Sequence, residues 1–425
     1  ELLGQTHPHQ PAQEVLLAQT EEMEARDLIR TEMPPPRPTY MFKHNITQEA
    51  AYATLLDDQR RELHRAVGQA LEHLRPGAVE QLAYHYSRSA MRDKTLFYLD
   101  KAARKARHEY ANDLALNYYD QALRLEERWE WLTGQAEVLH VLGRRDEERA
   151  RLESLEAASE APAFDVAYLW GQYYEALSKY SPAQAAIQRA SREATDVMDR
   201  VRCLAQLGLI ARRQGEYDKA QAWYHQALEL LRGQGAYPDE EAQVLNGLGI
   251  VYRQQNRFDE ATTCLEKALT LSRGSGNRLV EAETLNSMGG TAYYQRDFAR
   301  ALVYHRQALE IRRAIGDRVG EGISLYNLAL ITRDAGDYGQ AQEHLSAALT
   351  IHQVTGNRWE EVNVWNELGI LYYQLGDLPR AQACLQQGLK LSQEIGDEVG
   401  RAYILSTLGQ VVLNQGDPGT AEELL

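Results

Sequence analysis

The chain has 425 residues and a formal net charge of −15, so it is too long for one compact core and is predicted to form several domains or one long solenoid. The acidic balance disfavours non-specific nucleic-acid binding, which needs a basic surface, and no apolar run reaches the roughly 18 residues that a membrane-spanning helix requires. The three cysteines lie far apart without CxxC spacing, which argues against disulfides and structural zinc and favours a reduced, cytoplasmic setting.

The first 56 residues combine helix and strand patterns. Residues 12–30 predict an amphipathic helix entered at Pro11, because proline is favoured in the first helical turn. The stretch LIRTEMPPPRPTYMFKH then predicts two short strands joined by a proline-rich loop, since prolines cannot continue a strand ladder. A helix capped by Thr47 follows. This order of helix, hairpin and helix indicates that residues 1–56 are the C-terminal part of a winged-helix domain.

Internal repeats fill most of the remaining chain. Residues 57–93 are predicted to form connecting helices, and residues 94–425 are predicted to form a repeat array. Related segments such as LNGLGIVYRQQNRFDEA and LNSMGGTAYYQRDFARA recur 40 residues apart. They begin at Leu245, Leu285, Leu325 and Trp365. With weaker matches on both sides, the array is expected to contain about nine helix pairs, the last of them cut off at Leu425.

Small residues recur at fixed places within each repeat unit. The first column consists of Gly208, Gly249, Gly289, Ala329, Gly369 and Gly409, and the second consists of Ala220, Ala261, Ala301, Ala341, Ala381 and Ala421. Small side chains at these intervals let two helices approach closely, and a larger one would cost about 1–3 kcal/mol through overpacking. Each unit is therefore predicted to be a pair of antiparallel helices. Residues 131–158 fit poorly, because Glu148 stands at a small position.

A short polar sequence follows the second helix of the long units. It reads Gly276-Asn277, Gly316-Asp317, Gly356-Asn357 and Gly396-Asp397 in successive units. Glycine is favoured just after the last helical turn, and asparagine or aspartate is favoured as an N-cap. We therefore expect each second helix to end at the glycine and the next helix to begin after the capping residue.

The paired helices and the small-residue columns resemble the tetratricopeptide repeat, whose unit has about 34 residues. The units here are six residues longer and look like those of bacterial regulatory proteins and cell-polarity adaptors. The resemblance implies an all-α superhelical solenoid with 40-residue units, preceded by the partial winged helix with its small β-hairpin. It also implies that the first helix of each pair lines the concave side.

The resemblance gives a set of candidate peptide-binding residues on the first helices. One row holds Asn246, Asn286, Tyr326 and Asn366, and another holds Arg212, Arg253, Tyr293, Arg333 and Tyr373. Asparagines would bond an extended peptide backbone, and each arginine bond to a carboxylate of an acidic ligand would contribute about 1.5–3 kcal/mol. Alternatively, these residues are polar side chains on a solvated face. The lysine and asparagine of the carboxylate clamp in chaperone-binding tetratricopeptide domains are missing from the matching rows.

Three motifs within residues 1–126 resemble the junction in STAND-type signal-transduction ATPases, where a winged helix connects a nucleotide-binding domain to a superhelical sensor. They read FKHNITQEAAYATLL, RRELHRAVGQALE and EQLAYHYSRSA. The resemblance implies that His44 contacts the β-phosphate of ADP, and imidazole can donate such a hydrogen bond. Alternatively, His44 is hydrogen-bonded within the winged-helix core. No cofactor is expected in this chain, because ADP or ATP would need the nucleotide-binding domain outside it.

Together these patterns predict the sensor region of a bacterial STAND-type ATPase, which binds a protein or peptide and signals through the winged helix to the nucleotide-binding domain. The alternative is a standalone tetratricopeptide scaffold or adaptor that binds extended peptides. We expect no enzyme, because the sequence has no phosphate-binding loop, HExxH motif or GxSxG elbow. His305 and His344 fall at near-equivalent places, where packing explains them better than a metal site.

Overall fold

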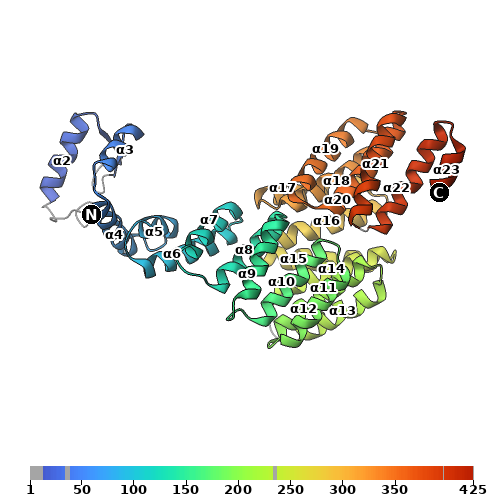
Figure 1. Cartoon of the computed structure of the whole chain (residues 1–425), viewed down its shortest axis with the longest axis horizontal. Helices are drawn as coiled ribbons and strands as arrows, with labels where there is room; N and C mark the ends of the chain where they lie inside the picture. Colours follow the sequence, from blue (N-terminus) through green and yellow to red (C-terminus); the bar gives the residue numbers. More distant parts are fainter. Residues whose placement is uncertain (1–12, 34–38, 233–236, 396, 425) are drawn as a thin grey trace. The chain divides into compact units, whose positions relative to one another are not determined.

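Helices account for nearly all regular structure in the computed structural model, which describes residues 13–33, 39–232, 237–395 and 397–424 (Figure 1). The chain divides into two compact units, Glu1–Trp131 and Leu132–Leu425. None of the helices in the described ranges has the length and apolar character needed to cross a membrane. The all-α fold with one small hairpin confirms the predicted fold class.

The first unit begins with the predicted helix, hairpin and helix. These elements are α2 (Gln13–Ala25), β1 (Ile29–Met33), β2 (Thr39–Phe42) and α3 (Asn45–Ala53). The strands pair antiparallel, with Ile29 opposite Phe42, while Pro11 and most of the proline-rich loop lie outside the described residues. The predicted cap at Thr47 is wrong. The carbonyl of His44 already accepts hydrogen bonds from the backbone N–H groups of Thr47 and Gln48, so the cap is His44 and helix α3 begins three residues earlier than predicted.

The rest of the first unit is helical. It contains α4 (Asp57–Leu74), α5 (Val79–Tyr86), α6 (Arg92–His108) and α7 (Asn112–Leu123). Its core stacks Tyr86 on Tyr98 with ring centroids 5.3 Å apart, and the Tyr98 hydroxyl donates to the Glu72 carboxylate at 2.6 Å. The winged-helix assignment and the domain boundaries after residues 56 and 93 stay predictions.

Helices then alternate to the end of the chain. They are α8 (Trp129–Leu142), α9 (Arg145–Ala157), α10 (Ala163–Ala176), α11 (Tyr180–Glu193), α12 (Val197–Arg213), α13 (Tyr217–Leu231), α14 (Pro238–Gln254), α15 (Phe258–Ser275), α16 (Arg278–Tyr294), α17 (Phe298–Ala314), α18 (Arg318–Asp334), α19 (Tyr338–Thr355), α20 (Arg358–Gln374), α21 (Leu378–Ile395), α22 (Glu398–Asn414) and α23 (Pro418–Leu424). Within the second unit, each even-numbered helix from α10 packs against the helix that follows it, and successive pairs stack (Figure 1).

The glycine column explains how the two helices of a pair approach each other. Four of these glycines face the side chain found sixteen residues later, on the second helix of the same pair. A Cβ atom placed on any of the four glycines would come closer to that side chain than van der Waals contact allows. The distances would be 2.8 Å from Gly208 to Tyr224, 2.8 Å from Gly249 to Leu265, 2.6 Å from Gly289 to His305 and 2.5 Å from Gly369 to Leu385. The alanine column is buried throughout. The predicted close packing of each pair is therefore confirmed.

The polar sequences between units form the expected caps. Gly276 and Gly356 end their helices with φ values of 77° and 65°, a left-handed conformation that glycine adopts without steric cost. The Asn277 side chain then accepts a hydrogen bond from the N–H of Val280, and Asp317 accepts one from Gly320. These bonds satisfy N–H groups that the first helical turn leaves unpaired, which fixes where each new unit begins.

The poorly matching residues 131–158 still form a helix pair, because a buried ion cluster replaces the small residue. Glu148 on α9 is only 2% exposed and accepts hydrogen bonds from His140 at 2.8 Å and Arg145 at 2.5 Å. Burial alone would raise the pKa of Glu148, but the hydrogen bonds and charges of His140 and Arg145 lower it below its ordinary value. The carboxylate therefore stays charged and holds α8 and α9 together.

Candidate functional site

The predicted groove residues lie on one wall of the second unit. Successive first helices from α10 to α22 contact one another, whereas no comparable contacts join the second helices in the described part of the chain. The closer spacing on the first-helix side means that the stack curves toward that side. The first helices therefore form the inner wall, as expected, and we use this name for the surface of α12, α14, α16, α18 and α20 that carries both candidate rows.

Hydrogen bonds between neighbouring first helices occupy part of the inner wall. Four of them link residues 41 positions apart: Asn327 to Asn286 at 3.0 Å, Tyr293 to Asp334 at 2.7 Å, Thr407 to Asn366 at 3.5 Å and Asn414 to Tyr373 at 2.7 Å. Four candidate binding residues therefore stabilise the stacking of the repeats. The sequence repeats every 40 residues, so aligning the repeats did not reveal these partners. Each hydrogen bond instead joins a residue to the position 41 residues away.

Arg333 is neutralised within the protein. Its guanidinium pairs with Glu367 of the next repeat and with Asp334 at 2.9 Å, and its side chain is only 14% exposed. Burial raises the pKa of Glu367 to about 7, although the positive charge of Arg333 opposes that rise. The expectation that Arg333 meets a ligand carboxylate is therefore corrected, because Glu367 and Asp334 already take its hydrogen bonds.

Arg212 and Arg253 differ from Arg333, because neither forms an ion pair with a carboxylate among the described residues. The Nε atoms of both side chains are buried and have no protein hydrogen-bond partner. Burial lowers the pKa of Arg253 to about 10, and the charge of Arg212 contributes to that shift. Their neighbour Arg213 is neutralised differently, with its Nε 3.4 Å from Glu175. Within the described part of the chain, two arginines of the inner wall thus have no carboxylate bonded to them.

Asn246 and Tyr326 complete the first candidate row. Asn246 is 8% exposed, and its buried Oδ1 atom has no protein partner. Tyr326 is half-buried in the corresponding place two repeats later, and burial raises its pKa well above the ordinary value. Asn246 therefore has an acceptor atom that can receive a hydrogen bond from a ligand amide.

The second unit curves far enough for distant repeats to touch. The Arg213 guanidinium on α12 lies 5.1 Å from the ring centroid of Trp359 on α20. A Cβ atom on Gly143, in the turn after α8, would lie 2.8 Å from the Cβ of Thr355 at the end of α19. We call these two contacts the closure of the inner wall. Sequence reasoning missed them, because no local pattern relates residues so far apart.

The histidines singled out from the sequence lie in different surroundings. His44 is exposed and its side chain makes no capping hydrogen bond, so the alternative of a core histidine is wrong and the nucleotide-sensing role stays a prediction. His305 is 1% exposed and bonds Asn286 at 3.0 Å, which is a packing role. In the described ranges, no three His, Cys, Asp or Glu side chains are grouped to hold a metal ion.

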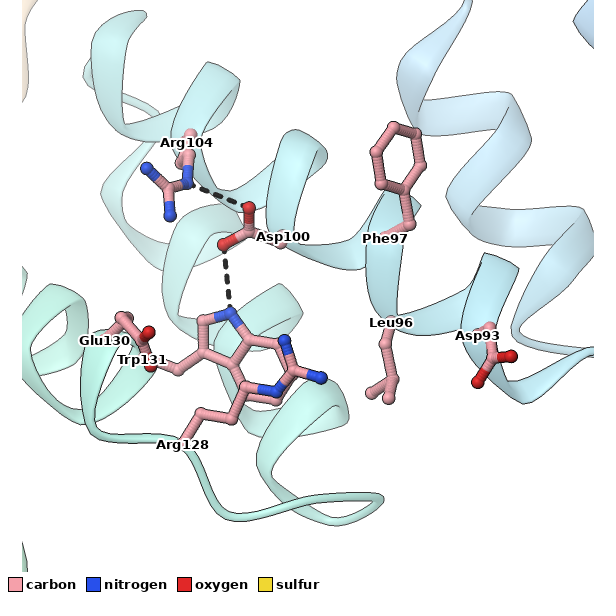
Figure 2. A pocket seen from close by; sticks show the side chains of 8 residues that line it. All are labelled: Asp93, Leu96, Phe97, Asp100, Arg104, Arg128, Glu130 and Trp131. Atoms are coloured by element: carbon pink, nitrogen blue, oxygen red, sulfur yellow. Dashed lines mark hydrogen bonds and ion pairs between the residues drawn. The ribbon is translucent and has the colours of Figure 1, made fainter. Parts of the chain in front are cut away.

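Figure 2 shows a pocket of about 320 Å³ in the first unit that the sequence did not indicate. It is lined by Asp93, Leu96, Phe97, Asp100, Arg104, Arg128, Glu130 and Trp131. The Asp100 carboxylate accepts hydrogen bonds from Trp131 Nε1 and Arg104 Nε, both at 2.9 Å. These bonds hold the Trp131 ring and the Arg104 guanidinium beside Asp100, which therefore has a structural role in the first unit.

Comparisons with known proteins agree with this architecture. A tetratricopeptide repeat model matches residues 199–274, 280–353 and 360–425, which together exceed half of the chain, while no curated protein sequence is significantly similar. The crystal structure of a Rap protein complexed with competence and sporulation factor is similar with a TM-score of 0.53 and 15% identity, covering 70% of this chain and 89% of that one. The APC/C hetero-tetramer Cut9–Hcn1 gives a TM-score of 0.51 and 16% identity, covering 86% and 62%. This chain belongs to the tetratricopeptide repeat family.

Proposed function

We propose that the second unit binds an extended segment of a partner protein along the inner wall. The observation that carries this proposal is the group of buried atoms without a protein partner at Asn246, Arg212 and Arg253. Most buried polar atoms in folded proteins are hydrogen-bonded, and leaving one unpaired costs free energy. Three such residues on one wall are therefore suited to a ligand that supplies the missing bonds.

The fold supports the same proposal. Stacked helix pairs present a long curved surface, and such surfaces serve chiefly to bind other proteins. The related Rap structure contains competence and sporulation factor, which supports uptake of a ligand by a fold of this kind. The hydrogen bonds between neighbouring first helices hold the wall in a fixed form, so less conformational freedom is lost when a ligand binds.

The finer proposal concerns signalling. We place the chain in a STAND-type ATPase, where ligand binding to the second unit would change nucleotide exchange in a domain outside this chain. The helix–hairpin–helix order of residues 13–53 and the exposed position of His44 support it. A standalone adaptor remains the competing function and predicts no link to a nucleotide.

Peptide binding is tested by selection from a random library of 12-residue peptides displayed on phage. The purified chain should enrich defined sequences, and synthetic copies should bind in fluorescence anisotropy. Asn246→Ala should weaken binding about three- to tenfold, the loss expected for one hydrogen bond. Gln307→Ala, an exposed change on the second helix α17, is the matched control and should leave affinity unchanged. Failure to enrich any sequence would contradict the proposal.

The signalling proposal is tested on the full parent protein. His44→Ala should speed ADP release from a nucleotide-binding domain preceding residue 1, because a hydrogen bond to the phosphate is lost. Release is measured with a fluorescent ADP analogue, and His108→Ala, an exposed change in the same unit, serves as control. A parent sequence without a phosphate-binding loop upstream of Glu1 would favour the adaptor function instead.

A further inference from the structure

The arginines of the inner wall are not equivalent, and their differences indicate where a ligand's charge goes. Arg333 is neutralised by Glu367 and Asp334, and Arg213 lies against Glu175. Arg212 on α12 and Arg253 on α14 form no ion pair with any carboxylate of the described residues, and the buried Nε atoms of both have no hydrogen-bond partner. These two neighbouring helices therefore carry the arginines that are left without a bonded carboxylate.

The position of Arg253 depends on Gly290 of the next repeat. The corresponding residues of the other repeats are Leu209, Ile250, Leu330 and Ile370. A Cβ atom on Gly290 would clash with Nη1 of Arg253, so the guanidinium occupies space that a larger side chain fills elsewhere. Glycine inside a helix destabilises it by about 0.5–1 kcal/mol relative to alanine. At Gly290 this cost is accompanied by the space that the Arg253 guanidinium occupies.

Arg212 is held in a related way. The Tyr224 ring from α13 lies over Gly208 and Gly247, where a Cβ atom would approach its Cζ atom to 2.8 Å and 2.5 Å. Burial and the charge of Arg213 lower the pKa of Arg212, while Tyr224 and Glu175 oppose that shift. The residues corresponding to Gly247 in the other repeats are Gln206, Ser287, Asn327 and Glu367. The space for Tyr224 is therefore specific to this part of the wall.

We infer that Arg212 and Arg253 form a binding site for an oxyanion of the peptide ligand, either a carboxylate or a phosphate. This inference rests on the proposed binding of a peptide by the inner wall. A partly buried guanidinium without a counter-ion is unfavourable, and an oxyanion supplies both the opposite charge and acceptors for its N–H groups. Tyr294 lies beside the site, with its ring centroid 5.4 Å from Arg253 and 63% of its surface exposed. Its ring can pack against the peptide next to the anion.

The site is first tested without a peptide, by thermal unfolding in sodium phosphate and in sodium chloride at equal ionic strength. Phosphate should raise the melting temperature of the wild type more than that of Arg212→Gln or Arg253→Gln. Arg333→Gln and Arg257→Gln are the controls and should keep the phosphate effect, because Arg333 is neutralised and Arg257 pairs locally with Glu260. Equal phosphate effects in the wild type and in both site variants would overturn the inference.

The second test uses peptides selected by the wild type. Each is synthesised with its acidic residue, with the corresponding amide, and with phosphoserine at that position. The wild type should bind an oxyanion form at least tenfold better than the amide, and this preference should vanish in Arg212→Gln and Arg253→Gln but persist in Arg257→Gln. Whichever of the two charged peptides binds more tightly identifies the oxyanion. Equal binding of charged and amide peptides would overturn the inference.

The two tests separate the two proposals. If no peptide is selected but phosphate stabilises the wild type through Arg212 and Arg253, the oxyanion site stands and peptide binding is wrong. If peptides bind without a preference for charge and phosphate has no specific effect, peptide binding stands and the oxyanion site is wrong.

Discussion

At the scale of single residues, charge and burial decide which polar groups stabilise the fold. Glu148 and Glu367 are both buried carboxylates, but their surroundings differ. Two donors lower the pKa of Glu148, whereas burial dominates for Glu367 and raises its pKa to about 7. Glu148 therefore contributes stability mainly as a charged partner, which leads to a prediction about pH.

Glu148→Gln should reduce the free energy of unfolding by about 1.5–3 kcal/mol at pH 7, because charge-assisted hydrogen bonds from His140 and Arg145 are lost. The lowered pKa means that the carboxylate stabilises the protein above the pKa of the unfolded chain, near 4.3, and that this stability is lost as pH falls through the folded value. Urea unfolding followed by circular dichroism should show the two proteins converging below about pH 4.

The control for this experiment is Glu147→Gln. Glu147 pairs with Arg144 on the surface, where its side chain is 54% exposed, and such exposed pairs contribute about 0–1 kcal/mol. A loss in Glu148→Gln that stays undiminished as the pH falls below about 4 would contradict the role assigned to its charge.

At the scale of helices and turns, the sequence was a good guide wherever the cause was local. Gly276 and Asn277 act as predicted, because a left-handed turn and a side-chain cap depend on neighbouring residues alone. Gly289 also acts as predicted, since a fixed spacing within one unit brings His305 onto it. The start of α3 was misjudged, because the backbone hydrogen bonds begin at His44 although Thr47 is the better capping side chain.

At the scale of the whole molecule, the closure of the inner wall within the second unit is the feature most relevant to the proposed binding. It includes the Arg213 guanidinium against the Trp359 ring and Gly143 against Thr355. A cation–π contact contributes about 0.5–2 kcal/mol.

Trp359→Ala should loosen the closure and lengthen the distance between α12 and α19. The distance is measured by electron paramagnetic resonance between spin labels at Gln214→Cys and Val354→Cys, both exposed positions, after the native cysteines are replaced by serine. Wild type should give a narrow distribution, and Trp359→Ala should give a broader one centred at a longer distance. An unchanged distribution would show that this contact does not hold the wall closed.

The control for the closure is Arg257→Ala. The Arg257 guanidinium lies 4.3 Å from the ring centroid of Tyr252, a contact within one repeat. Its loss should leave the label distance as in wild type, because it does not connect distant repeats.

The sequence alone determined the helix pairs, their caps and the small-residue packing. These features follow from spacings of a few residues, through helical periodicity and the steric demands of close contact. Only the tertiary structure decided that Arg333 pairs with Glu367 while Arg212 and Arg253 have no carboxylate partner, and that Arg213 reaches Trp359. Residues that recur at the same place in each repeat can be assigned to one surface from the sequence. Which of them form ion pairs depends on the neighbouring helices and on the curvature of the stack. That curvature accumulates from small rotations between many repeats, and no single repeat sequence contains it.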